Sequence, residues 1–99
     1  MIEGAKLRAV EGGDYTHWCP GCEEIHVLPI ERGRWTFDGN LTAPTCAPSF
    51  IHKWHSWDEK TSTRVENVCH YVLTAGILNF CTDSTHALAG QNVPLRSIT

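Results

Sequence analysis

Two cysteines flank a Pro-Gly pair in the segment HWCPGCEEIH, residues 17–26. In a Cys-Pro-Gly-Cys turn the sulfurs of Cys19 and Cys22 point at one place, which is the geometry of a zinc knuckle. A pair of reduced thiols is the plain alternative. A thioredoxin-type redox motif fits less well, because it needs a helix that starts at the first cysteine, whereas EEIHVLPI continues as a strand. The segment therefore predicts half of a zinc site.

The other half of the site must come from later in the chain, because tetrahedral structural zinc takes four protein ligands. We expect a hairpin over residues 64–81, which brings residue 81 back beside Cys69 and His86 close behind it. A site with four protein ligands leaves no position for water, so the predicted Zn²⁺ is a scaffold and not a catalyst. The predicted ligands are Cys19, Cys22, Cys69 and His86, and the alternatives for the fourth are His17, His26, His70 and Cys81.

A second set of residues could perform hydrolysis. Ser49 ends the proline-braced segment APSF, where a serine is ordinarily a turn or cap residue, and as a nucleophile it needs a base within hydrogen-bond reach. His70 is the candidate base, since it follows Cys69 on a predicted strand and projects to the opposite face. Asp83 could orient the imidazole as the third member of a triad. The plain alternative for His70 is a structural histidine.

The segment HKWHSW, residues 52–57, crowds two histidines and two tryptophans. On a strand, His52 and Trp54 share one face while His55 and Trp57 share the other. One aromatic face could pack and the other stay partly exposed. The alternative is an aromatic contact surface for a protein partner, since Trp dominates binding hot spots.

Short β-branched and aromatic runs, separated by turn residues at intervals of roughly ten, are expected to position these groups. We predict a mostly β protein: a small antiparallel domain over residues 1–99, clamped by the knuckle. One short helix or helical turn is expected over Asp83–Gly90, with a cap at Asp83 or Ser84. The tail from about residue 91 is expected to be extended or loose. The predicted strands are Lys6–Val10, Tyr15–Trp18, Ile25–Ile30, Arg34–Phe37, Phe50–Trp57, Arg64–Leu73 and Ile77–Cys81.

Composition narrows the function classes. The chain has 99 residues, a formal net charge of −3 and no basic run, which argues against a nucleic-acid binder. No apolar window is long enough for a secretory signal or a membrane span. Five cysteines without a signal peptide favour metal binding over a disulfide framework. We therefore expect a soluble cytoplasmic protein.

Four motifs in order resemble a family of small phage and prophage proteins of unknown function, often labelled ammonia monooxygenase: HWCPGCEEIHVLPI, WTFDGNLTAPTCAPSF, VCHYVLTAGILNFC and DSTHALAGQNVPL. The resemblance covers roughly residues 15–95 and implies a phage or prophage origin and a zinc-binding fold in the host cytoplasm. The monooxygenase label has no support, since one thiolate-rich zinc site offers no copper or iron redox centre.

The chain is also distantly similar to proteins encoded beside bacterial ubiquitin-like conjugation genes, for which a peptidase role is plausible. The matching features are the paired cysteines, Pro48-Ser49 and Cys69-His70-Tyr71. The chain departs from that pattern at Thr45–Ser49, where Ser-Pro-Ser is typical, and the DSTHALAG module is particular to the phage-type members.

From the sequence we expect a non-catalytic zinc-binding module for a host or phage protein. The alternative is a small serine-type hydrolase or peptidase with a structural zinc, using Ser49, His70 and Asp83.

Overall fold

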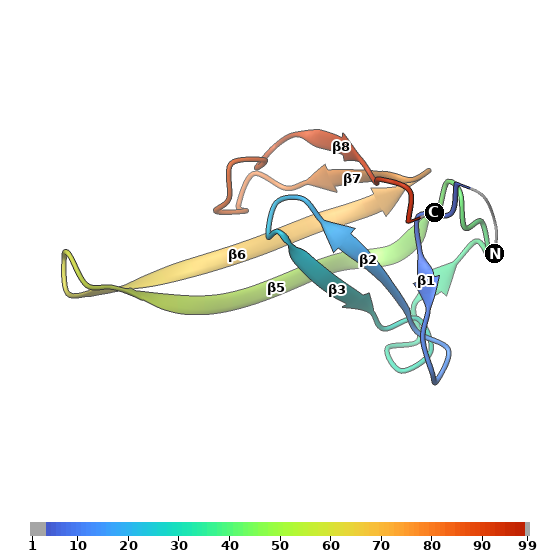
Figure 1. Ribbon diagram of the computed structural model, residues 1–99, viewed down its shortest axis with the longest axis horizontal. Coiled ribbons are helices and arrows are strands. Elements are labelled where there is room, and N and C mark those ends of the chain that lie inside the picture. Colours follow the sequence, from blue (N-terminus) through green and yellow to red (C-terminus); the bar gives the residue numbers. More distant parts are fainter. Residues whose placement is uncertain (1–3, 99) are drawn as a thin grey trace.

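The computed structural model describes residues 4–98, which form two antiparallel sheets. The first sheet has the order β1-β2-β3 and the second the order β4-β5-β6-β7-β8 (Figure 1). Each of the seven predicted strands overlaps an observed one, so the antiparallel β class is confirmed. The strands are β1 (Arg8–Ala9), β2 (Tyr15–Cys19), β3 (Glu24–Leu28), β4 (Thr36–Phe37), β5 (Cys46–Asp58), β6 (Thr63–Thr74), β7 (Ile77–Phe80) and β8 (Asn92–Pro94).

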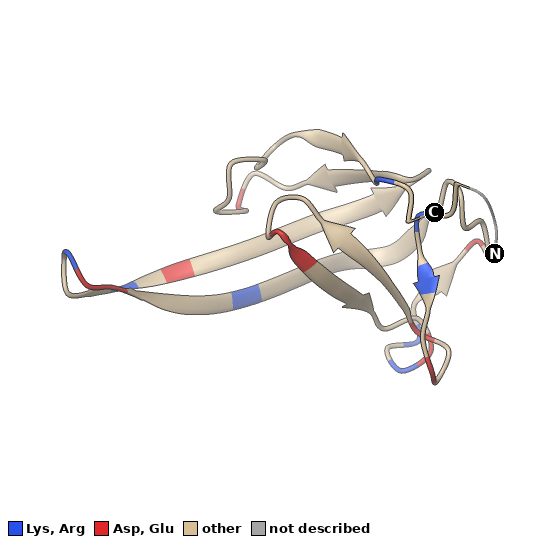
Figure 2. Cartoon of the chain, in the orientation of Figure 1, with Lys and Arg blue, Asp and Glu red and all other residues tan. Residues whose placement is uncertain are grey.

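The longest elements, β5 and β6, pair from Phe50–Tyr71 out to Asp58–Thr63 and form a ribbon that projects from the body (Figure 1). This ribbon gives the molecule its longest dimension of 47 Å. Its far half has no other strand beside it among residues 4–98. Charged side chains gather at its tip, where Asp58 Oδ1 accepts the Lys60 N–H at 3.0 Å (Figure 2).

The near half of the ribbon is covered by β2 and β3. Side chains of these strands pack against the inner ends of β5 and β6, as in the stacked ring pair of His26 and Phe50, whose centroids are 4.7 Å apart. Tyr71 is fully buried at the centre of this contact. The core consists of Leu7, Cys19, Leu28, Cys46, Cys69, Tyr71, Leu73, Leu78, Phe80 and Leu95.

The predicted hairpin over residues 64–81 is present as β6 and β7. Its two-residue turn, Ala75-Gly76, has φ angles of 50° and 79°, and such a pair of left-handed residues matches the right-handed twist of the flanking strands. The Gly76 N–H also donates to the Pro44 carbonyl at 2.8 Å, so the turn is held against the loop before β5.

The predicted helix at Asp83–Gly90 is wrong. Residues 84–86 are irregular and lie between turns at 82–83 and 87–90, and the part of the chain from 4 to 98 contains no α-helix. The physical reason is that polar groups at the start of the segment bond to the edge of β6: Thr85 N–H donates to the Val68 carbonyl at 2.9 Å. A helix would withdraw those groups from the sheet.

The tail, expected to be extended or loose, adds a strand to the sheet. Residues 92–94 form β8 and pair with β7, and Leu95 is 3% exposed. Between β4 and β5, Asp38 Oδ1 accepts N–H bonds from Asn40 and Thr45 and shapes a loop. Across residues 4–98, no helix of the length and apolarity required to span a bilayer is present.

Candidate active site and metal centre

Two neighbouring residues of β6 face opposite sides of the sheet. The Cys69 side chain is buried beneath β2 and β3, while His70 is partly exposed on the other face. This is the alternation expected for a strand, in which successive side chains point to opposite faces. We name the two sides the metal face and the open face.

On the metal face, the ligand atoms of Cys19, Cys22, His26 and Cys69 all lie within 4.8 Å of one another. The turn after β2 sets the first two, because the Glu23 N–H donates to the Cys19 carbonyl at 2.8 Å. The Sγ atoms of Cys19 and Cys69 are 3.8 Å apart. Two sulfurs on a tetrahedral zinc with Zn–S bonds of about 2.3 Å are separated by about 3.8 Å, so the spacing fits that ion.

The three thiols are close enough to shift one another's pKa values. The Cys69 thiol donates a hydrogen bond to Cys19 and, against the cost of burial, lowers the pKa of Cys19 to about 3. The same contact raises the pKa of Cys69, and burial raises the pKa of Cys22 to about 11. These contacts favour ionisation of Cys19 and protonation of Cys22 and Cys69. A divalent cation would displace the remaining protons, as thiolate metal sites require.

A chain of hydrogen bonds sets the tautomer of His26. The Trp18 carbonyl can only accept, so His17 Nδ1 donates to it at 3.0 Å. Burial lowers the pKa of His17 to about 4, so its ring is neutral and Nε2 accepts the Tyr71 hydroxyl proton at 2.6 Å. The Tyr71 oxygen is then free to accept from His26 Nδ1 at 3.1 Å. His26 Nε2 is left as a buried nitrogen that has no hydrogen bond within residues 4–98, and the nearest carboxylate oxygen, Glu24 Oε1, lies 3.6 Å away.

His86, the expected fourth ligand, lies outside this group and rests on the turn of the knuckle. A Cβ at Gly21 would come within 2.4 Å of the imidazole, so only glycine permits this approach. His86 Nδ1 accepts the Leu88 N–H at 3.2 Å, which puts the proton of the neutral ring on Nε2. In this arrangement the buried Nε2 is a donor and not a metal ligand.

On the open face, Ser49, His70 and Asp83 form a continuous chain of hydrogen bonds. Ser49 Oγ lies 3.1 Å from His70 Nε2, and both carboxylate oxygens of Asp83 lie 3.1 Å from His70 Nδ1. All three residues were singled out from the sequence, and the structure brings them together. The Asp83 side chain is 56% exposed, so the site opens to solvent.

The segment after β7 positions Asp83 by bonding along the edge of β6. Buried Ser84 uses its Oγ both to accept the His70 N–H and to donate to the His70 carbonyl, each at 3.0 Å. Cys81 N–H also donates to that carbonyl at 2.8 Å. The backbone of the candidate base and the segment that carries Asp83 are therefore fixed to each other.

Cys81 adds a third donor near the base: one ligand atom each from His70, Cys81 and Asp83 lie within 4.8 Å of one another. Burial raises the pKa of the Cys81 thiol, and the nearby Asp83 carboxylate raises it further. The sulfur therefore stays protonated. Both ring nitrogens of His70 already have partners in Asp83 and Ser49. Because both nitrogens of the His70 ring are hydrogen-bonded, neither is free to bind a second metal ion.

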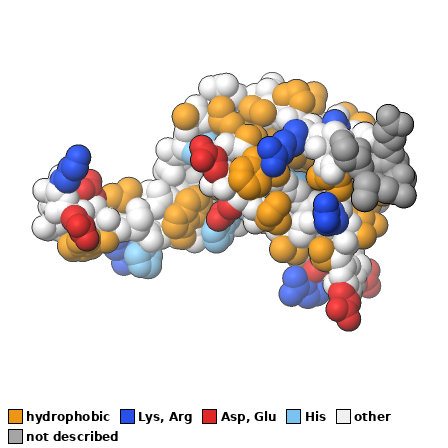
Figure 3. All heavy atoms as spheres, in the orientation of Figure 1, with side chains coloured by type: hydrophobic (Ala, Val, Ile, Leu, Met, Phe, Trp, Pro, Cys, Tyr) orange, Lys and Arg blue, Asp and Glu red, His pale blue; other side chains and the backbone are white. Residues whose placement is uncertain are grey.

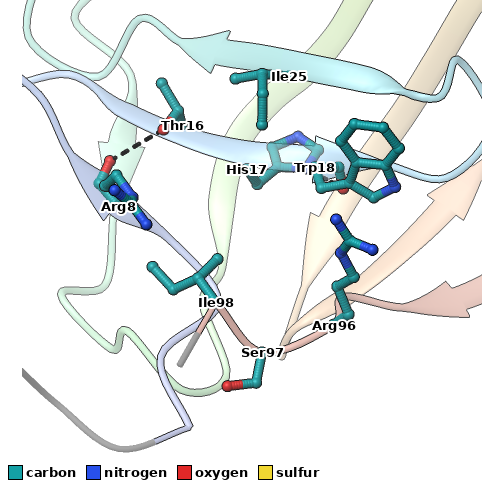
Figure 4. A pocket seen from close by; sticks show the side chains of 8 residues that line it. All are labelled: Arg8, Thr16, His17, Trp18, Ile25, Arg96, Ser97 and Ile98. Atoms are coloured by element: carbon teal, nitrogen blue, oxygen red, sulfur yellow. Dashed lines mark hydrogen bonds between the residues drawn. The ribbon is translucent and has the colours of Figure 1, made fainter.

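A hollow of about 490 Å³ lies elsewhere, between β1, β2, β3 and the C-terminal segment (Figure 4). Arg96 lies over the Trp18 ring with its Cζ 4.7 Å from the ring centre, at one side of this hollow. None of Ser49, His70 and Asp83 lines it. The candidate triad therefore lies outside this pocket.

The side chains of the segment at residues 52–57 alternate between the two faces of the strand, as predicted. His52 and Trp54 stack with ring centroids 4.8 Å apart on the metal face, whereas Trp57 is 63% exposed on the open face. Sequence reasoning missed the parts played by Tyr71 and Ser84. No local pattern distinguishes a buried tyrosine hydroxyl between two histidines, or a serine that bonds a strand 14 residues before it.

Comparison with protein families decides the relationship of the chain. A family model described as bacterial ubiquitination-like system serine protease (BubE) matches residues 3–81. The chain belongs to the BubE family. The match includes Ser49, His70 and the four clustered metal-face residues and ends two residues before Asp83. No curated protein and no solved structure matches the chain. The expected link to bacterial ubiquitin-like conjugation systems is thereby confirmed.

Proposed function

We propose that this BubE-family chain is a serine-type peptidase in which Ser49 is the nucleophile, His70 the general base and Asp83 the residue that orients the base. The single observation that carries the proposal is the unbroken chain Ser49–His70–Asp83, with each link at 3.1 Å. This replaces the binding module favoured by the sequence, because a binder has no need of a serine, an imidazole and a carboxylate in that order.

The geometry allows the steps of acyl transfer. Ser49 O–H donates to His70 Nε2, so the imidazole can take the proton as the oxygen attacks a carbonyl carbon. The same nitrogen then gives the proton to the leaving amine. Asp83 accepts from His70 Nδ1–H, which holds the ring in the tautomer whose Nε2 is free to accept and stabilises the imidazolium that forms.

We assign Zn²⁺ to the metal face as a structural ion held by Cys19, Cys22, Cys69 and His26. The sulfur-rich donor set, the 3.8 Å sulfur spacing and the buried Nε2 of His26, which has no hydrogen bond within residues 4–98, support this choice. Held by these four residues, the ion would tie β2, the knuckle and β3 to β6 at the residue before His70. It would thereby fix the strand that carries the base.

The family description supports the role of a serine protease in a bacterial ubiquitination-like system. A cytoplasmic location, a phage or prophage origin and a host or phage protein as partner remain predictions from the sequence.

A serine-reactive fluorophosphonate probe tests the proposal, with the labelled site identified by mass spectrometry. We expect stoichiometric labelling at Ser49 and labelling at least ~10³-fold slower in His70→Gln, because nucleophile and base act as a unit. His55→Gln, which alters an exposed histidine on the same face, is the matched control and should label as the wild type does. Labelling of Ser49 that is unchanged in His70→Gln would contradict the proposed base.

A further inference from the structure

The edge of β5 beside Ser49 has no neighbouring strand. β4 pairs with β5 only at Cys46 and Ala47, and the pairing register shifts between Cys46 and Phe50. From Phe50 to Asp58, β5 pairs with β6 alone within residues 4–98. The candidate nucleophile thus stands where the covered part of this edge ends and the open part begins.

The direction of the backbone groups along this edge follows from the register. The N–H and C=O of His70 bond to Ser84 and Cys81, on the side of β6 away from β5. Ile51 lies opposite His70, so this is a pair that exchanges no backbone bonds, and the N–H and C=O of Ile51 also point away from the ribbon.

A second pair gives the same result. Val68 bonds to Thr85 with both its N–H and its C=O, and its partner across the ribbon is Lys53. Because the pattern repeats every two residues, the backbone N–H and C=O groups that point away from β6 are those of Ile51, Lys53 and His55. No hydrogen bond to these groups is found within residues 4–98. This edge offers alternating donors and acceptors that match one kind of ligand, another extended backbone.

The surroundings of the edge suit such a ligand. Ile51 is 48% exposed, and its side chain lies on the same face as His70. From Phe50 to Asp58, β5 contains no proline and no register shift against β6, although edge strands commonly carry such features. The far part of the ribbon projects from the body as an arm (Figure 3).

We propose that the substrate is an extended, unfolded polypeptide segment that binds by pairing as an additional strand with the open edge of β5 at Ile51, Lys53 and His55, which carries its backbone past Ser49. This inference rests on the proposed peptidase function. Main-chain hydrogen bonds supply the affinity, so the substrate is a tail or linker and not a folded surface. The open position of the triad, away from the hollow of Figure 4, agrees with a ligand held at an edge.

Two proline variants test the edge without breaking the ribbon. Lys53→Pro removes an outward N–H on the β5 edge and no bond between β5 and β6. Glu66→Pro is the matched control, because Glu66 lies opposite His55 and its N–H points outward on the other edge of the ribbon. We expect Lys53→Pro to cut cleavage of fluorescein-labelled casein, an unfolded polypeptide, by about tenfold relative to fluorophosphonate labelling of Ser49. Glu66→Pro should leave this ratio unchanged.

Amide hydrogen exchange in Ser49→Ala gives a readout that does not depend on turnover. We expect the amides of Ile51, Lys53 and His55 to exchange fast in the free protein and to become protected when casein is added. Protection of these amides, without any probe labelling of wild-type Ser49, would support strand pairing at the β5 edge and refute the proposed peptidase function. Absence of protection, protection already present in the free protein through pairing of two copies, or a loss in Glu66→Pro as large as in Lys53→Pro would overturn the edge proposal.

Discussion

The two faces of β6 differ in burial and chemistry, although the residues that mark them, Cys69 and His70, are neighbours in the sequence. Around Cys69, three thiols and an imidazole are enclosed by two sheets, and the side chain has no exposed surface. Around His70, a hydroxyl and a carboxylate bracket an imidazole that solvent reaches. The first arrangement fits a closed structural site, in which all ligands come from protein. The second leaves room for a reacting carbonyl.

The contrast teaches that one strand can separate a scaffold from a reactive group without a second domain. The period of two places neighbouring side chains on opposite faces, so the metal face can be rigid while the open face stays accessible. A change at residue 69 should therefore act on folding, and a change at residue 70 on chemistry.

The largest effect is expected from Cys69→Ser. Loss of one of three thiolates should abolish stoichiometric metal binding and cooperative folding, because the binding energy of a structural zinc, on the order of 10 kcal/mol, is folding energy. Elemental analysis and circular-dichroism melting measure both properties. His70→Gln is the control on the neighbouring residue and should keep metal and melting temperature. Cys46→Ser, at a buried cysteine outside the cluster, and Cys81→Ser should also keep the metal. A folded, metal-free Cys69→Ser protein would refute the scaffold role of this face.

A smaller effect separates the two candidate histidine ligands. His26→Ala should weaken zinc binding by at least ~100-fold, since loss of even an outer partner of a ligand costs about 10–100-fold. His86→Ala should bind zinc as tightly as the wild type. Competition with a chromophoric chelator measures both affinities. The reverse result would restore His86 as the fourth ligand and make the His26–Tyr71–His17 chain a feature of packing alone.

The smallest expected effect concerns the contact between Gly21 and His86. Gly21→Ala should destabilise the zinc-loaded protein by about 1–3 kcal/mol, because the added methyl overlaps the imidazole. In the double variant Gly21→Ala/His86→Ala the penalty should largely disappear, which a double-mutant cycle measures as coupling in denaturant unfolding. Additive losses would place the two residues out of contact.

Much of the site could be predicted because its residues lie close in sequence or are set by alternation. The Pro-Gly turn brings Cys19 and Cys22 together by itself, and the period of two puts Cys69 and His70 on opposite faces wherever the strand is placed. The short β-branched runs also gave the antiparallel class and the hairpin of β6 and β7.

What the sequence by itself determined is therefore local: the knuckle, the strands and the candidate residues of both faces. Only the tertiary structure decided the rest. It turned Asp83–Gly90 from an expected helix into a segment bonded along β6, because Ser84 and Thr85 gain sheet partners that a helix would forfeit. It placed His26 in the metal cluster through Tyr71, a residue 45 positions away. It left the β5 edge open beside Ser49, since β4 is too short to cover it. Each outcome depends on contacts between segments distant in the chain, and local propensity carries no information about these.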